Sequence, residues 1–220
     1  MITIGLTGSI GMGKSTAAAM LRRLGAPMFD ADAEVHRLLG PGGAAVAAVE
    51  RAFPGVRDEN GGISRPRLGA QVFGKPEALK RLEMILHPAV RAAEWRFVAQ
   101  GRARRLPLIV LDIPLLFETH ADALCDAIIV VSAPPWLQRQ RVLRRPGMTS
   151  ARLASILAAQ MPDAEKRRHA DFVVETGLGR GLTLRRLAGA LRLLRRGNWR
   201  REACVKRALE VRQGRAREGR

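Results

Sequence analysis

The sequence predicts an α/β fold in which a mostly parallel, five-stranded sheet lies between layers of helices. Short apolar runs typical of buried strands alternate with helical patterns along the chain. The first of these runs leads directly into a glycine-rich turn and a helix. The expected strands are residues 2–6, 27–29, 106–111, 127–132 and 172–174. A chain of 220 residues has room for one such domain with a small inserted lobe.

The expected helices are distributed unevenly between these strands. One helix follows the first strand, and a group of helical segments then separates the second strand from the third. The expected helices are residues 16–24, 33–39, 44–53, 66–73, 76–86, 89–100, 135–144, 150–159 and 182–194. Pro88 is expected in the first turn of a new helix, where proline is tolerated. The long helical stretch predicts an inserted lobe at about residues 33–100, within a domain of residues 1–194.

Residues 8–15 read Gly-Ser-Ile-Gly-Met-Gly-Lys-Ser, which matches the phosphate-loop pattern G-x-x-x-x-G-K-S between a strand and a helix. Glycines let backbone N–H groups turn toward phosphate oxygens, and the helix N-terminus adds partial positive charge. Lys14 is expected at the β- and γ-phosphates of ATP, and the Ser15 hydroxyl on Mg²⁺. The alternative is an ordinary glycine turn, which the complete match in this context disfavours. The expected nucleotide contacts are Gly8, Gly11, Met12, Gly13, Lys14, Ser15 and Thr16.

Two acidic segments follow expected strands. Asp30-Ala31-Asp32 stands at the carboxyl end of the second strand, where ligands bind in open parallel sheets. Either one carboxylate faces the cleft while the other caps the next helix, or both only cap. Asp32 is the candidate base for the proton of an attacking hydroxyl.

The third strand ends in Asp112, which resembles the acidic residue that helps to hold Mg²⁺ in phosphate-loop enzymes. Because Ile113 follows it, the acid pair of motor-type ATPases is missing, which favours transfer to a bound acceptor rather than to water. Further along, Glu118 is expected either in the acceptor site or in a pair with a nearby arginine.

An arginine-rich helix pair is predicted to act as a lid at about residues 139–168. Gln138, Arg141 and Arg145 are spaced by three and four residues, which places them on one face of a helix. The Pro146-Gly147 pair then breaks that helix. Guanidinium groups above the phosphates would neutralise charge in the transition state, which makes Arg141 a catalytic candidate. A solvated basic helix is the alternative.

The formal net charge of +18 is concentrated in part at the end of the chain. Residues 195–220 contain ten Lys/Arg against three Glu, a run that either docks a polyanion or is a solvated terminus. Nucleic-acid binding is not expected, except non-specifically through this tail. Cys125 and Cys204 form no CxxC pair, so neither a disulfide framework nor a zinc site is expected. No apolar run is long enough to cross a bilayer and no secretory segment is recognisable, so we expect a cytoplasmic protein.

Taken together, the motifs resemble those of the dephospho-coenzyme A kinase family. The resemblance covers nearly the whole chain to about residue 194, and its more specific parts are the DAD, HP and DIPLLFE segments and a late Ala-Asp pair. The matching residues are 5–15, 30–32, 86–88, 112–118, Gln138, Arg141, Arg145, Gln160, 166–167 and 170–171. The resemblance implies a phosphate-loop kinase fold with a nucleotide core, a helical acceptor lobe and a lid.

The resemblance also implies an activity: ATP-dependent phosphorylation of the ribose 3′-hydroxyl of dephospho-coenzyme A. It makes Asp32 the base, and it places His87 toward the acceptor and Arg141 and Arg145 in or beside the lid. Arg145 and Glu118 are further acceptor-site candidates. The family pattern does not account for the arginine-rich tail.

The chain departs from the usual family pattern in two places. Ser9 and Met12 replace a frequent glycine and a small polar residue. Residues 175–177, Glu-Thr-Gly, replace a more typical Asn-x-Gly near the adenine, which bears on nucleotide selectivity.

Three other functions remain as alternatives. A related kinase acting on a nucleotide or another small hydroxyl compound would share every motif except DIPLLFE and HP. A GTP-driven switch would need an N-K-x-D motif, which the sequence lacks. A nucleic-acid-binding module would depend on the basic tail and would bind RNA with a steep salt dependence.

Overall fold

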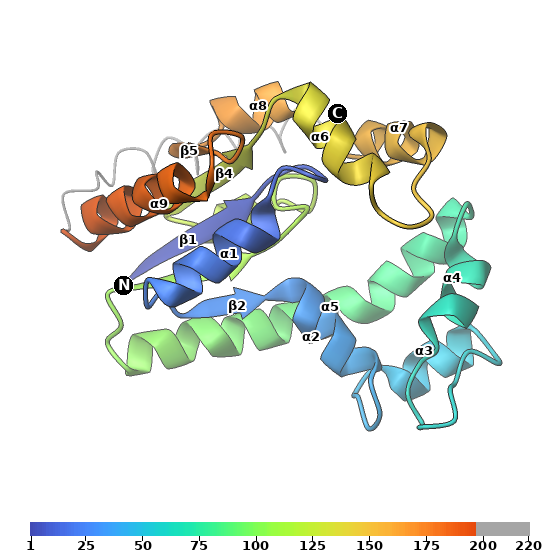
Figure 1. Cartoon of the computed structure of the whole chain (residues 1–220). Coiled ribbons are helices and arrows are strands. Elements are labelled where there is room, and N and C mark those ends of the chain that lie inside the picture. The colour runs from blue at the N-terminus through green and yellow to red at the C-terminus, as the bar shows by residue number, and fades with distance from the viewer. Residues whose placement is uncertain (197–220) are drawn as a thin grey trace, which may run out of the picture. The chain divides into compact units, whose positions relative to one another are not determined.

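A computed structural model describes residues 1–196 of the chain, and they form two compact units (Figure 1). One unit is built from residues 1–29 together with residues 101–196, and it carries most of the sheet. The other unit is residues 30–100 and is mainly helical. Apart from Arg195 and Arg196, the expected basic tail lies outside the described residues.

The sheet has five strands in the order β2-β3-β1-β4-β5. The strands are β1 (Ile2–Thr7), β2 (Met28–Asp30), β3 (Leu108–Asp112), β4 (Ala127–Ser132) and β5 (Phe172–Glu175). β1 pairs in parallel with both β3 and β4, and β4 pairs in parallel with β5. Each expected strand is confirmed, with ends moved by at most two residues. Because β1 and β3 are parallel and Leu6 is in register with Asp112, the loops that follow these two strands begin at the same edge.

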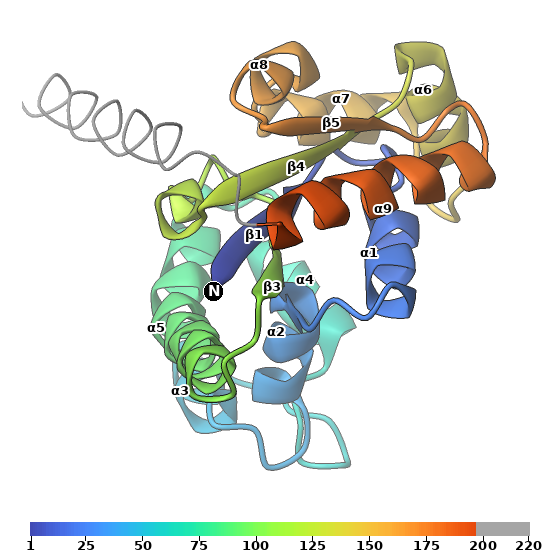
Figure 2. The ribbon, with the colours of Figure 1, turned by 90° about the vertical axis from the view of Figure 1, so that its left-hand side faces the viewer.

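Two helices cover one face of this sheet. α1 (Lys14–Arg23) and α9 (Arg180–Arg195) pack against each other and contribute to the same apolar core as the inward-facing strand residues. Figure 2 shows α1 and α9 next to each other, to the right of β1. Ile4, Leu6, Ile129 and Leu187 are fully buried in this core. The rest of the unit comprises η1 (Ala121–Leu124), α6 (Pro135–Leu143), α7 (Ser150–Ala158) and α8 (Asp163–Arg168).

The helical unit contains α2 (Ala31–Leu39), α3 (Val46–Ala52), α4 (Arg65–Val72) and most of α5 (Pro76–Ala103). Its core is formed by apolar side chains from all four helices, among them Leu38, Val49, Leu68 and Leu82. Within residues 1–196, no helix is long and apolar enough to span a bilayer.

The expected helix boundary at Pro88 is wrong, because α5 runs without a break from Pro76 to Ala103. Proline removes one backbone N–H and crowds the preceding turn, which usually ends or kinks a helix. Here Leu82 and Leu86 before the proline and Val90 after it pack into or against the same core. Tertiary packing on both sides of Pro88 therefore outweighs the local preference. The short helix α8 was not expected, because its sequence is too polar to show an apolar repeat.

Candidate active site

Lys14 and Asp112 form an ion pair at the edge where β1 and β3 end. The Nζ atom of Lys14 lies 2.7 Å from Oδ1 of Asp112, and the Asp112 side chain is only 4% exposed. Lys14 is the first residue of α1, and Asp112 is the last residue of β3. The sheet thus brings together two predicted site residues that lie 98 positions apart in the sequence.

The glycines of the phosphate loop are required by close approach and by backbone conformation. A Cβ atom on Gly8 would lie 2.5 Å from Cγ2 and 2.7 Å from the carbonyl oxygen of Val131, so the loop runs directly against β4. Gly13, the N-cap of α1, has φ of 90°, a left-handed conformation that side chains disfavour. The first N–H groups of α1 have no intrahelical partner and are left for an anion.

Three successive carbonyl groups of the loop accept hydrogen bonds from side chains around it. Gln138 Nε2 donates to the Ile10 oxygen (2.8 Å), Arg141 to the Gly11 oxygen (3.3 Å), and Thr176 Oγ1 to the Met12 oxygen (2.7 Å). On the other side of Ile10, its N–H donates to Oε1 of Gln160 (3.1 Å). The loop is therefore held in shape by residues from α6, from the segment after α7 and from the segment after β5.

Two residues in the segments that depart from the family pattern have clear structural roles. Met12 is 2% exposed and belongs to the core of the sheet, and its sulfur accepts a hydrogen bond from the Ala133 N–H (3.0 Å). Thr176 bonds the Met12 oxygen, and it also receives two hydrogen bonds from Arg141, to Oγ1 (3.0 Å) and to its backbone oxygen (2.9 Å). Thr176, which belongs to the departing segment of residues 175–177, thus lies in the hydrogen-bond network of the phosphate loop.

Arg141 and Arg145 were predicted on one helix face, but the structure gives them different surroundings. Arg141 lies on α6, is half-buried and bonds the phosphate loop and Thr176. Arg145 lies after the end of α6 and is exposed, with its N–H bonded to the Val142 oxygen. α6 and α7 pack together, and Arg139 on α6 donates to the Ser150 hydroxyl on α7 (3.0 Å). We call α6, the turn after it and α7 the lid hairpin.

Glu118 pairs with a lysine that sequence reasoning did not single out as its partner. The Nζ atom of Lys166 lies 2.8 Å from Oε1 of Glu118, and the Lys166 side chain has no exposed surface. The same Glu118 oxygen accepts a hydrogen bond from the Met161 N–H (2.9 Å). Oε2 of Glu118 is buried and has no hydrogen-bond partner within residues 1–196. Glu118 therefore anchors the chain where it leaves the lid hairpin.

The two carboxylates of the DAD segment have different surroundings. Asp30 is the N-cap of α2, and its Oδ1 accepts a hydrogen bond from the Ala33 N–H (3.0 Å). Asp32 lies in the first turn of α2 and is exposed, and among residues 1–196 its carboxylate has no hydrogen bond or ion pair. Of the two arrangements that the sequence left open, the structure has Asp30 as the cap. Asp32 remains available to a ligand.

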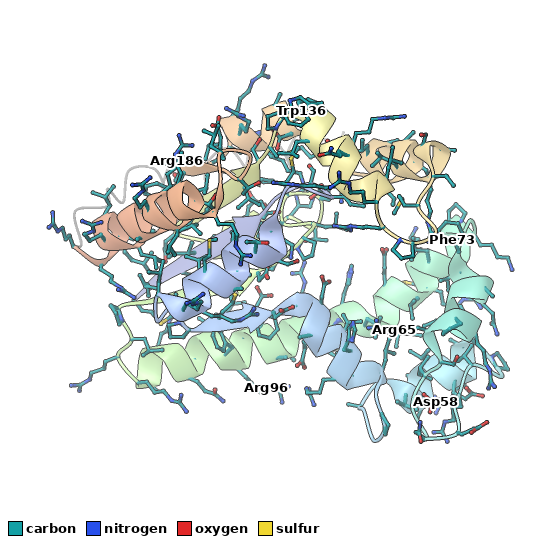
Figure 3. All side chains as sticks on the ribbon, in the orientation of Figure 1. Asp58, Arg65, Phe73, Arg96, Trp136 and Arg186 are labelled. Carbon is teal, nitrogen blue, oxygen red and sulfur yellow. The ribbon has the colours of Figure 1, made fainter. Side chains whose placement is uncertain are left out.

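The helical unit holds a cavity of about 340 Å³ beside α2 and the start of α4. His36, one helical turn after Asp32, lines it together with Arg65 and the loop residue Asp58. Figure 3 labels Arg65 and Asp58. Asp58 is engaged in its own loop, where Oδ1 accepts from the N–H groups of Asn60 and Gly62. The imidazole of His36 and the guanidinium of Arg65 have no partner among the described residues.

His87 and Glu94 both lie on α5 but differ in burial. His87, predicted near the acceptor, is exposed. Glu94 is 5% exposed, and burial raises the pKa of its carboxyl group, an effect that Arg91 partly opposes. Its Oε1 has no hydrogen-bond partner within residues 1–196. Nothing in the sequence distinguishes Glu94 from a surface glutamate.

A second cavity, of about 700 Å³, lies where β4 and β5 end. Its lining includes Ser132, Trp136, Asp163, Arg167 and Gly177. Gly177 belongs to the segment that the family resemblance predicts to lie near the adenine. The two cavities lie in different units of the chain, and each is complete within its own unit.

Comparisons with known proteins identify the family of this chain. The sequence model of the family "Dephospho-CoA kinase" matches residues 2–178. The dephospho-CoA kinase of Paramagnetospirillum magneticum is 66% identical over 168 residues, which are 76% of this chain and 78% of the relative. That of Rhodospirillum rubrum is 58% identical over 200 residues, 90% and 95% of the two chains.

Solved structures show the same fold. A crystal structure from Thermus thermophilus is 37% identical with a TM-score of 0.72, covering 86% of this chain and 95% of that one. The dephospho-CoA kinase from Campylobacter jejuni is 24% identical with a TM-score of 0.61, covering 87% and 96%, and supports the fold alone. With a family model that matches most of the sequence and close relatives of nearly equal length, the chain belongs to the dephospho-CoA kinase family.

Proposed function

We propose that this protein transfers the γ-phosphoryl group of ATP to the ribose 3′-hydroxyl of dephospho-coenzyme A, giving coenzyme A and ADP. The observation that carries the proposal is the Lys14–Asp112 ion pair beside a phosphate loop that is held by side-chain hydrogen bonds, in a chain of this family. Phosphoryl transfer depends mainly on positioning and on charge stabilisation, and this unit is built for both.

Each charged group of the site has its own role in the proposed reaction. The loop N–H groups and the start of α1 hold the phosphates, and the Lys14 ammonium neutralises charge that develops on the transferred group. Arg141 adds a second cation that is already oriented by Thr176. Arg145, exposed in the turn of the lid hairpin, would approach the substrates from the lid. Asp32 accepts the proton of the acceptor hydroxyl.

Ser15 and Asp112 are the proposed ligands of Mg²⁺. Both supply the oxygen donors that Mg²⁺ prefers, and Mg²⁺ commonly takes few protein ligands besides phosphates and waters. Asp112 is held at its place by the end of β3 and by Lys14. When bound, the ion would neutralise phosphate charge during transfer.

The acceptor is proposed to bind to the helical unit. His36 follows Asp32 by one turn of α2, so the cavity beside His36 and Arg65 lies close to the proposed base. Its two partnerless basic side chains suit the diphosphate of dephospho-coenzyme A. His87 is a further proposed acceptor contact. We propose a cytoplasmic location, where ATP is available, and we propose that the basic tail binds nucleic acid at most non-specifically.

The test is formation of coenzyme A and ADP from Mg-ATP and dephospho-coenzyme A by the purified chain. Asp32→Asn should lower turnover by about 100-fold or more while ATP affinity is kept. Asp30→Asn is the matched control, because asparagine also caps helices, and it should remain active. Equal turnover of Asp32→Asn and the unaltered protein would remove the base assignment. ADP formation only with a different small alcohol would favour a related kinase.

A further inference from the structure

We propose that Gln138 and Gln160 are positioning residues that hold the phosphate loop in its nucleotide-binding form and join it to both ends of the lid hairpin. The proposal rests on the nucleotide-binding half of the proposed function and does not depend on the identity of the acceptor. Neither glutamine contacts the reacting atoms in the proposed mechanism.

Both glutamines bind the same loop residue with opposite polarity. Gln138 donates its amide N–H to the Ile10 oxygen at 2.8 Å, and Gln160 accepts the Ile10 N–H at 3.1 Å. The orientation of each amide is determined by the backbone, since an N–H can only donate and a carbonyl can only accept. Gln138 is 7% exposed, so its bond is largely shielded from water.

These bonds determine which way the loop N–H groups point. A trans peptide is planar, so the N–H of one residue points away from the carbonyl of the residue before it. Gln138 fixes the carbonyl of Ile10, and Thr176 fixes the carbonyl of Met12. The N–H groups of Gly11 and Gly13 are thereby directed to the opposite side, where a phosphate group would bind.

The same bonds connect the loop to the lid hairpin at its two ends. Gln138 is part of α6, and Gln160 follows α7 by two residues. The packing between α6 and the loop is tight, because a Cβ on Gly11 would lie 2.5 Å from Cγ2 of Val142. A displacement of the hairpin would therefore strain both bonds to Ile10 together. Nucleotide binding and the position of the hairpin are linked through this residue.

The experiment measures the dissociation constant of Mg-ADP, the KM of Mg-ATP, kcat and the unfolding temperature for five variants. Gln138→Met and Gln160→Met each remove one hydrogen bond and should weaken Mg-ADP binding by about three- to tenfold. Gln140→Met is the matched control, because Gln140 is exposed on the same helix, and it should bind as the unaltered protein does.

The decisive pair is Gln138→Glu and Gln160→Glu. Both place the same negative charge beside the same residue, but glutamate can still accept the Ile10 N–H and cannot donate to its oxygen. Gln138→Glu should therefore weaken Mg-ADP binding at least about threefold more than Gln160→Glu. Titrations in about 0.3 M salt reduce the repulsion between the added charge and the nucleotide.

Equal effects of the two glutamate variants would overturn the proposal, as would methionine variants that unfold earlier but bind Mg-ADP normally. If Gln138→Glu does not fold, the two methionine variants against Gln140→Met carry the same test. A protein that binds Mg-ADP as expected but makes no coenzyme A would contradict only the proposed acceptor. One that makes coenzyme A while all variants bind alike would contradict only this inference.

Discussion

Removal of the Lys14 charge should affect stability and catalysis separately, and a double variant can tell the two effects apart. Lys14→Met leaves the buried carboxylate of Asp112 without the ammonium group that lies 2.7 Å away. At that distance the attraction is about 6 kcal/mol for an effective dielectric constant near 20. Much of this attraction offsets the cost of removing the two charges from water.

The expected loss of folding free energy for Lys14→Met is about 3 kcal/mol, the low end for breaking a buried pair. The low end applies because the Lys14 side chain is 17% exposed, so water can reach Asp112 once the lysine is gone. For a chain of this size the loss corresponds to a fall in the unfolding temperature of about 6–12 °C. Asp112→Asn together with Lys14→Met removes both charges and should recover most of that stability.

Activity should not recover in the double variant. The positive charge beside the transferred phosphoryl group is missing in both proteins, so kcat should stay at least about 100-fold below that of the unaltered protein. Thermal unfolding without nucleotide or Mg²⁺ and steady-state kinetics are the measurements. Arg23→Met, which removes an exposed charge from the same helix, is the control. A double variant as unstable as Lys14→Met would refute the reasoning.

Three further predictions concern other groups. Burial raises the pKa of Glu94, so the folded state holds its proton to higher pH than the unfolded state does, and stability is lost as pH rises from about 4.5 through the folded-state pKa. In denaturant titrations, Glu94→Gln should therefore gain stability relative to the unaltered protein across that pH range. If the free energy of unfolding depends on pH in the same way in both proteins, the raised pKa is contradicted. Arg65→Met should raise the KM for dephospho-coenzyme A by about tenfold and leave the KM for ATP unchanged. The control is Arg51→Met, which removes an exposed arginine of the same unit and should change neither KM. If the two variants have the same KM for dephospho-coenzyme A, Arg65 is not part of the acceptor site. Lys166→Met should lower the free energy of unfolding, measured by denaturation, by about 3 kcal/mol. The double variant Lys166→Met with Glu118→Gln should lose distinctly less. If the loss in the double variant equals the sum of the losses in the two single variants, the pair is not coupled.

The order of elements could be predicted because each depends on local sequence. The runs at residues 127–132 and 2–6 are short and mostly apolar, which is typical of strands buried on both faces, and the structure has both as strands. The break expected at Pro88 was wrong, since packing on both sides of the proline keeps α5 continuous. The polar helix α8 has no apolar repeat that could have revealed it.

The candidate site was predictable in its motifs and less so in its partners. The backbone conformation of residues 8–15 requires glycine at particular positions, so the loop could be identified from its sequence pattern. The sequence allows either an acceptor role for Glu118 or a pair with an arginine, whereas its partner in the structure is Lys166. Gln160 has no signal in the sequence beyond the family resemblance, because its bond to Ile10 joins residues 150 positions apart.

The sequence by itself determined the strand–loop–helix unit with the phosphate-loop pattern, the strand ending in Asp112, the long helical insertion and the family. These features depend on neighbours in the chain, whose spacing decides which conformations and chemical groups are available. Only the tertiary structure decided that Lys14 pairs with Asp112, that Asp30 rather than Asp32 caps α2, and that Ile10 is bonded on both sides. Such contacts follow from the parallel register of the sheet and from close packing, which bring together side chains whose separation in the sequence carries no signal.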